Sequence, residues 1–166
     1  MIKLLKPTID TPSLKELIEY LSKLESGTVP QWGTMNSTQM CRHCNNFIEL
    51  YLGKVKVSVI IRFLARIIGS IFLKKILSKS PKKTPKNLKT LPSIRVNTEE
   101  LDYITEHSSL INSLENIVEL KGIIEHPLYR KMTSTDVISL IRHHTAHHFH
   151  QFSLLSNNKP SHESLK

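Results

Sequence analysis

Histidines are concentrated near the C-terminal end of this chain, where five of the nine lie between His143 and His150. The surrounding segment, 133–155, repeats apolar residues at helical spacing, and a helix of about 100° per residue places His144 and His148 about 40° apart. Both imidazoles then project from the middle of the apolar face. Two imidazoles one helical turn apart can bind a single metal ion. The competing interpretation is a pair of core histidines that hydrogen-bond to their neighbours.

The remaining histidines of this segment point to other sides of the same helix. His143 and His150 fall about 100–120° from His144, on the polar side. His147 falls on the shoulder of the apolar face, about 60° away, and is the best-placed candidate acid or base. The periodicity therefore selects His144 and His148 as the inward-facing pair.

A third histidine from another helix would complete such a site. Asn36 is a candidate N-cap with Gln39 as its capping-box partner, and the pattern that follows predicts a helix over 36–52. On that helix His43 lies in the apolar stripe, so it also faces the core. Three neutral imidazoles leave part of a coordination sphere open to water or substrate, and they suit zinc, nickel or iron equally. The expected ligands of one divalent metal ion are His43, His144 and His148.

Further side chains are candidates for the wall of a pocket around the metal: Trp32, Tyr51, His126, Tyr129, His147 and Gln151. Each has a structural alternative. Trp32 and Tyr51 are also typical core aromatics, and His126 can simply fix a loop. Gln151 faces inward, where hydrogen bonding is a simpler role than reaction. No single residue is assigned as catalytic.

The chain of 166 residues is long enough for one domain with a buried core, and its five glycines favour helices over sheets. Apolar periodicity predicts helices over 14–24, 36–52, 98–120 and 133–155. We therefore expect an all-α four-helix bundle as a single domain over 1–158, with a disordered tail at 159–166. No apolar stretch of signal-peptide length follows Met1, and Cys41 and Cys44 are expected as free thiols. These features predict a cytoplasmic protein.

A long basic connection, about 54–92, joins the second and third predicted helices. Residues 50–98 carry twelve Lys and Arg and no Asp or Glu, which accounts for the whole net charge of +9. Residues 54–77 alternate like a strand at first and then follow helical spacing, so their conformation is left open. Two arginines in the middle argue against a membrane span. We expect heavy packing, within the fold or in a homodimer, with a membrane-surface helix as a further alternative.

The end of this connection, 78–92, combines three prolines with several lysines and predicts an exposed loop. Its simplest role is a solvated crossover between helices. A nucleic-acid patch needs aromatic stacking or arginine, and this loop has neither, which argues against nucleic acid as a partner.

Three stretches of the chain are distinctive when they are taken together. They are Trp32-Gly-Thr-Met-Asn-Ser-Thr-Gln-Met-Cys-Arg-His-Cys, His126-Pro-Leu-Tyr-Arg-Lys-Met and His144-Thr-Ala-His-His-Phe-His-Gln-Phe. In order and spacing, over roughly residues 10–155, they resemble the DinB/YfiT-like superfamily, and more narrowly its branch called domain of unknown function 1569. The resemblance implies a four-helix bundle that holds a divalent metal with histidines from its second and fourth helices. The matching positions are His43, His144 and His148.

The resemblance also implies a class of reaction. Some members of the superfamily are transferases or isomerases that use low-molecular-weight thiols such as bacillithiol or mycothiol. A metal-dependent enzyme acting on a small molecule is therefore expected, with thiol transfer or hydrolysis as the reaction, because a bound cation activates thiols and water. The alternative is a non-catalytic metal-binding or interaction bundle, in which residues 54–89 contact a membrane surface or a polyanion. Cys41 and Cys44 match no role in the family; Cys44 would be a nucleophile only if activated, and an inert thiol is the simpler interpretation.

Overall fold

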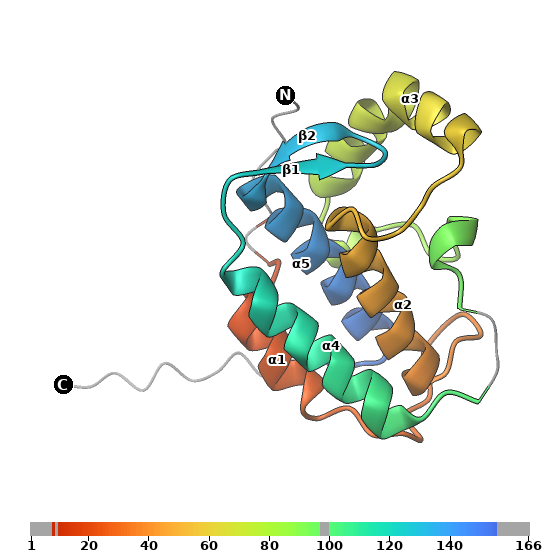
Figure 1. The fold of residues 1–166 in the computed structure, drawn as a ribbon. Coiled ribbons are helices and arrows are strands. Elements are labelled where there is room, and N and C mark those ends of the chain that lie inside the picture. Colours follow the sequence, from red (N-terminus) through yellow and green to blue (C-terminus); the bar gives the residue numbers. More distant parts are fainter. Residues whose placement is uncertain (1–7, 9, 97–99, 156–166) are drawn as a thin grey trace.

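The computed structural model describes residue 8 and residues 10–96 and 100–155 (Figure 1). Its elements, in chain order, are α1 (Leu14–Leu21), α2 (Ser37–Tyr51), α3 (Val59–Leu77), the short 3-10 turns η1 (Pro81–Lys83) and η2 (Pro92–Ile94), α4 (Tyr103–Val118), β1 (Ile123–His126), β2 (Arg130–Thr133) and α5 (Ser134–Gln151). The described chain is mostly helical with one small two-stranded sheet. The tail that we predict to be disordered, 159–166, lies outside the described residues.

The helices α1, α2, α4 and α5 share the main apolar core. α1 and α2 each pack against both α4 and α5, as Figure 1 shows. Each of the four contributes a large, fully buried side chain: Leu17, Met40, Leu114 and Phe149. Burying a side chain of this size contributes about 1.5–3 kcal/mol to folding. The two helices that carry the predicted metal ligands, α2 and α5, are therefore held side by side.

Side-chain caps determine where these two helices begin. The predicted capping box is present, because the backbone N–H of Gln39 donates to Asn36 Oδ1 at 2.8 Å and that of Asn36 donates to Gln39 Oε1 at 3.0 Å. At the start of α5, the backbone N–H of Asp136 donates to Thr133 Oγ1 at 3.1 Å. The register of both helices, and so the direction of their histidines, follows from these caps.

The helix predicted over 98–120 is shorter than expected. It begins at Tyr103 because Asp102 is its N-cap and accepts the backbone N–H of Thr105 at 2.8 Å. Residues 98 and 99 of the predicted first turn lie outside the described residues. The first and last predicted helices also end earlier than predicted, at Leu21 and Gln151.

A β-hairpin replaces the loop predicted before the last helix, so a purely helical fold was wrong in this detail. β1 and β2 pair antiparallel, with Glu125 opposite Lys131. The turn is closed by His126, whose Nδ1 accepts the backbone N–H groups of Leu128 at 3.1 Å and Tyr129 at 3.2 Å. A side chain that satisfies two turn amides leaves no trace in apolar periodicity, which explains why the hairpin was missed.

The ambiguous segment after α2 forms the helix α3, with Ser58 as its N-cap. The heavy packing expected for it is absent on its outer face, where apolar side chains are exposed: Val59, Ile60, Phe63, Leu64, Ile67, Ile68 and Ile71. Its inner side lies close to the hairpin, since a Cβ added at Gly69 would stand 2.4 Å from Tyr129 Cε1. None of the helices in the described chain is long and apolar enough to cross a bilayer.

The lysine-rich stretch 78–92 is only partly the exposed loop that we expected. Its lysines are exposed, but Pro81 in η1 is buried and η1 packs on α5. The carbonyl of Pro81 accepts His147 Nδ1–H at 3.2 Å. This stretch therefore covers one side of the histidine-rich helix.

Candidate metal centre

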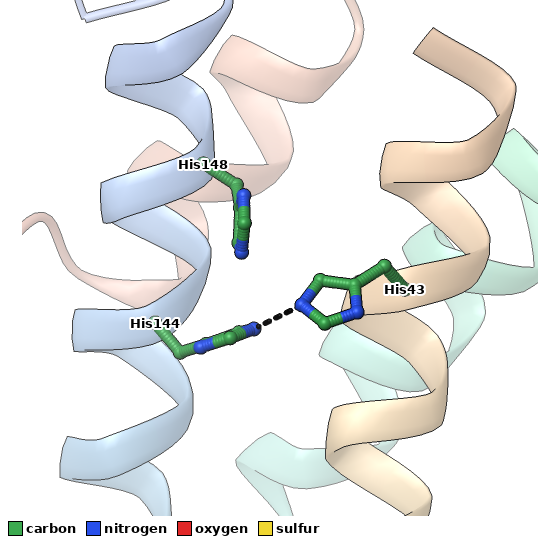
Figure 2. Close-up of side chains that lie close together, drawn as sticks. All are labelled: His43, His144 and His148. Atoms are coloured by element: carbon green, nitrogen blue, oxygen red, sulfur yellow. Dashed lines mark hydrogen bonds between the residues drawn. The ribbon is translucent and has the colours of Figure 1, made fainter. Parts of the chain in front are cut away.

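The structure brings His43, His144 and His148 together between α2 and α5, as Figure 2 shows. One ring nitrogen from each lies within 4.8 Å of the others, and the Nε2 atoms of His43 and His144 are 3.1 Å apart. The ring centroids of His43 lie 5.0 Å and 4.8 Å from those of His144 and His148. The three imidazoles selected by helical periodicity therefore point at one common space.

Hydrogen bonds on the far side of two of these rings orient them. His43 Nδ1–H donates to the carbonyl of Ile94 at 3.4 Å, and His148 Nδ1–H donates to Gln151 Oε1 at 2.8 Å. Gln151 is itself anchored, because its Nε2 donates to the carbonyl of Trp32 at 2.6 Å. In a neutral imidazole whose Nδ1 carries the proton, Nε2 keeps its lone pair. His43 and His148 thus present Nε2 as a ligand atom toward the shared space.

Burial keeps the three imidazoles neutral. Removal from water lowers the pKa of His43, and it lowers the pKa of His144 and of His148 well below the usual value of 6.5. Mutual repulsion among the rings, if charged, lowers the pKa of His144 and His148 further. Metal ions bind the neutral form, so no proton has to be displaced at neutral pH.

The donor set fits a divalent cation. Two nitrogens that are each about 2.0–2.1 Å from a tetrahedral zinc ion are roughly 3.3 Å apart, close to the 3.1 Å between His43 and His144 Nε2. Imidazole nitrogens suit zinc, nickel and iron. Three ligands from the protein leave at least one position for another group.

A cavity of about 410 Å³ adjoins the three histidines. Its wall includes five of the six predicted pocket residues: Trp32, Tyr51, Tyr129, His147 and Gln151. It also includes Leu73 and Ile76 of α3 and the stretch 87–91. A small molecule in this cavity would therefore lie beside the imidazoles, under a cover made by the basic connection.

The sixth candidate, His126, does not line this cavity. It is buried in the hairpin turn, packs against Tyr51 with ring centroids 4.2 Å apart, and stacks on Tyr129 at 4.9 Å. Burial lowers its pKa to about 3. These contacts favour the alternative given above for His126, that of a neutral residue that fixes the turn.

The expectation for His143 was wrong. The helical wheel placed it on the polar side, but it is buried, and its Nε2 lies 2.9 Å from Thr84 Oγ1. The segment after η1, distant in sequence, covers this side of α5. A helical wheel cannot anticipate that cover, because the wheel contains no information on what packs against each side.

Phe47 was also missed as a functional neighbour. Its ring stacks on His144 with centroids 3.6 Å apart and planes 2° from parallel, and it lines the cavity. Phe47 follows His43 by four residues, so the helical spacing that selected His43 would also have placed Phe47 on the same face.

The two cysteines are free and fully buried. Burial raises the pKa of Cys41 to about 12 and that of Cys44 well above 9. Neither thiol forms a thiolate readily, which supports the inert alternative considered for Cys44.

Fold and site together define a mostly helical protein with three histidines beside a cavity. Residues 5–154 match the family described as protein of unknown function (DUF1569), and the chain belongs to this family. No curated protein and no solved structure is similar enough to the chain to be matched. The family description assigns no reaction, so the chemistry of the site is the guide to function.

Proposed function

We propose that this protein is a metal-dependent enzyme that binds one divalent cation through His43, His144 and His148 and acts on a small molecule. The observation that carries the proposal is the convergence of three neutral imidazoles at the wall of a cavity of about 410 Å³. A purely structural site has four protein ligands and is closed, whereas a catalytic site keeps a position open. When bound, the cation would supply Lewis acidity and lower the pKa of a water or thiol that it holds.

His147 is the proposed general base. It lines the cavity, and its Nδ1–H is held by the carbonyl of Pro81, which leaves the Nε2 lone pair as the proton acceptor. Trp32 lies beside it with ring centroids 5.9 Å apart and would bound the substrate on that side.

We also propose that α1, α2, α4 and α5 form a four-helix bundle of the DinB/YfiT-like type, with thiol transfer as its reaction. The pairwise packing of these helices and the origin of the histidines, one from α2 and two from α5, support this proposal. The buried cysteines support it in a second way. Because neither is available as a thiolate, the reacting thiol would come from a small molecule bound in the cavity.

Metal analysis tests the centre itself. Protein purified without a histidine tag is expected to hold one zinc, nickel or iron per chain, and His144→Ala combined with His148→Ala should lose it. His150→Ala, on the same helix but outside the cluster, is the matched control and should retain the metal. Equal metal content in the double variant and the control would contradict the proposal.

Cobalt substitution tests whether the site is open to a thiol. Addition of free cysteine to the cobalt-loaded protein should produce an intense sulfur-to-cobalt absorption band, because a thiolate would occupy the remaining position. A spectrum that does not change, together with a retained cobalt ion, would indicate a closed structural site instead.

A further inference from the structure

The outer face of α3 is apolar and exposed from Val59 to Ile71. Between Val59 and Ile71, seven large apolar side chains have 52–76% of their surface exposed. Scattered exposed apolar side chains are ordinary, but a continuous face of this kind marks a binding surface. The face has no partner within the described chain.

α3 and the stretch that follows it are rich in positive charge and contain no acidic residue. α3 itself carries Arg62, Arg66, Lys74 and Lys75 and no acidic residue. The following stretch, 79–89, adds five exposed lysines, and the whole of 50–98 contains no Asp or Glu. A partner that matches α3 would therefore be both apolar and negatively charged.

A wide basic cleft lies along the flank of the same helix. It has a volume of about 1160 Å³ and lies between α3 and the hairpin, with Lys56, Arg62, Arg66 and Lys131 in its wall. Glu125 is the one acidic group in that wall. It is exposed, and its Oε1 lies 4.0 Å from Lys131 Nζ. Figure 1 shows α3 beside the hairpin, at the end of the molecule away from α1 and α4. The apolar face and the basic cleft thus belong to one end of the protein.

We propose that α3 lies in the surface layer of an anionic phospholipid bilayer. Its apolar side chains would enter the acyl boundary, and the arginines and lysines beside them would contact lipid phosphates. An interfacial helix needs this combination of one apolar face and flanking positive charge. In a spanning helix the four charges of α3 would be costly.

Two other possible partners would each match only one of the two properties of this surface, its apolar face or its positive charge. A second copy of the chain would cover the apolar face but would bring two clusters of unpaired arginine and lysine together, because a twofold interface places each patch against itself. Nucleic acid would satisfy the charge but offers no partner for a row of isoleucines. An anionic bilayer satisfies both.

Vesicle co-sedimentation of the full chain tests this proposal. Binding is expected to vesicles of phosphatidylcholine with about 30% phosphatidylserine, with little binding to phosphatidylcholine alone, and it should weaken as salt is raised, since screening shortens the reach of the charges. Ile60→Ser, Ile67→Ser and Ile71→Ser together should weaken binding about ten-fold or more, because each removes a side chain from the acyl region. Arg62→Gln with Arg66→Gln should weaken it about 25-fold, at about five-fold for each charge.

The control variant removes exposed apolar side chains that lie outside α3. Val29→Ser, Ile104→Ser and Val118→Ser delete side chains that are 56–79% exposed but lie outside α3, and this variant should bind vesicles like the wild type. All variants change exposed positions, so circular dichroism and thermal unfolding should show the folded protein in each case.

Several results would overturn the proposal. One is an absence of binding to anionic vesicles, and another is equal binding by the α3 serine variant and its control. A wild-type chain that elutes as a dimer, ignores vesicles and becomes monomeric in the serine variant would assign the face to a second copy. Tight binding to duplex DNA without vesicle binding would assign the basic segment to nucleic acid.

Discussion

The helices α3 and α5 depart from the usual distribution of side chains in opposite ways. α5 places polar imidazoles inside, with His143 and His148 buried and His144 against the cavity. α3 places isoleucines outside, with Ile60 and Ile71 at least 70% exposed. Burying a polar group and exposing an apolar one both cost free energy. The two proposals account for these departures by a cation beside α5 and a lipid surface beside α3.

The difference between the two helices lies in what packs around them. α5 contacts α1, α2, η1 and both strands, and Thr135 is its one exposed residue. α3 has one covered side, where Gly69 allows the ring of Tyr129 to come close. The same apolar residue type should therefore contribute differently to the free energy of unfolding in the two helices, and substitutions can measure this difference.

One isoleucine substitution in each helix compares α5 with α3 most directly. The expected change in the free energy of unfolding is the largest among these predictions. Ile141→Ala in α5 removes a side chain with no exposed surface and should lower the free energy of unfolding by about 2–5 kcal/mol. Ile67→Ala in α3, where 58% of the surface is exposed, should change it by no more than about 0.5 kcal/mol. Urea unfolding checks both, and similar losses would show that α3 is packed in solution.

Metal removal tests the partner of α5. A cation present at about 1,000 times its dissociation constant should add about 4 kcal/mol to the free energy of unfolding, because it binds the folded state. For a chain of this size that corresponds to a fall of roughly 8–16 °C in Tm on chelation. His144→Ala should show no metal-dependent change in Tm, and a wild-type Tm that is indifferent to chelator would remove the basis for a metal centre.

Gln151 allows a finer test of the same centre. Gln151→Ala removes the acceptor for His148 Nδ1–H and should weaken metal binding about 10–100-fold. Gln151→Glu keeps an acceptor at this position, although it loses the donor to the Trp32 carbonyl, and should bind metal close to wild-type strength. Calorimetric titration with zinc measures both. Equal affinity in the alanine variant and the wild type would show that this hydrogen bond does not orient the ligand.

His126 provides a separate test, that of a buried histidine for which we propose no metal. Its pKa is about 3 in the folded protein and about 6.5 in the unfolded chain, so between these values the unfolded chain binds the proton more tightly. The free energy of unfolding should therefore fall as pH drops through this window, by up to about 1.4 kcal/mol per pH unit from this residue.

His126→Asn supplies the comparison, because its amide oxygen can still accept the turn amides but does not titrate. The variant should lose stability less steeply than the wild type between pH 6 and pH 4, a range in which other buried histidines such as His143 also contribute. Unfolding at pH 8, where His126 is neutral in both states, corrects for the substitution itself. Parallel pH profiles would contradict the burial of a neutral His126.

Apolar periodicity and capping residues predicted much of the site-bearing structure. The Asn36–Gln39 box set the start of α2, and a constant angle per residue then placed His43 inward. The same reasoning failed for His143, because Thr84 comes from a segment that approaches only after folding. It failed again at the hairpin, where one imidazole closes the turn. Local rules describe a helix well, but they do not describe its neighbours.

The order of residues alone determined the four helices of the core, the capping box of α2 and which imidazoles share a face, because these depend on contacts within a few residues. It also determined the one-sided charge of 50–98. Tertiary structure alone decided that His43 meets His144 and His148 across α2 and α5, and that α3 keeps its isoleucines exposed. Both depend on which surfaces meet after folding, because the free energy of burial depends on how much apolar surface that packing removes from water.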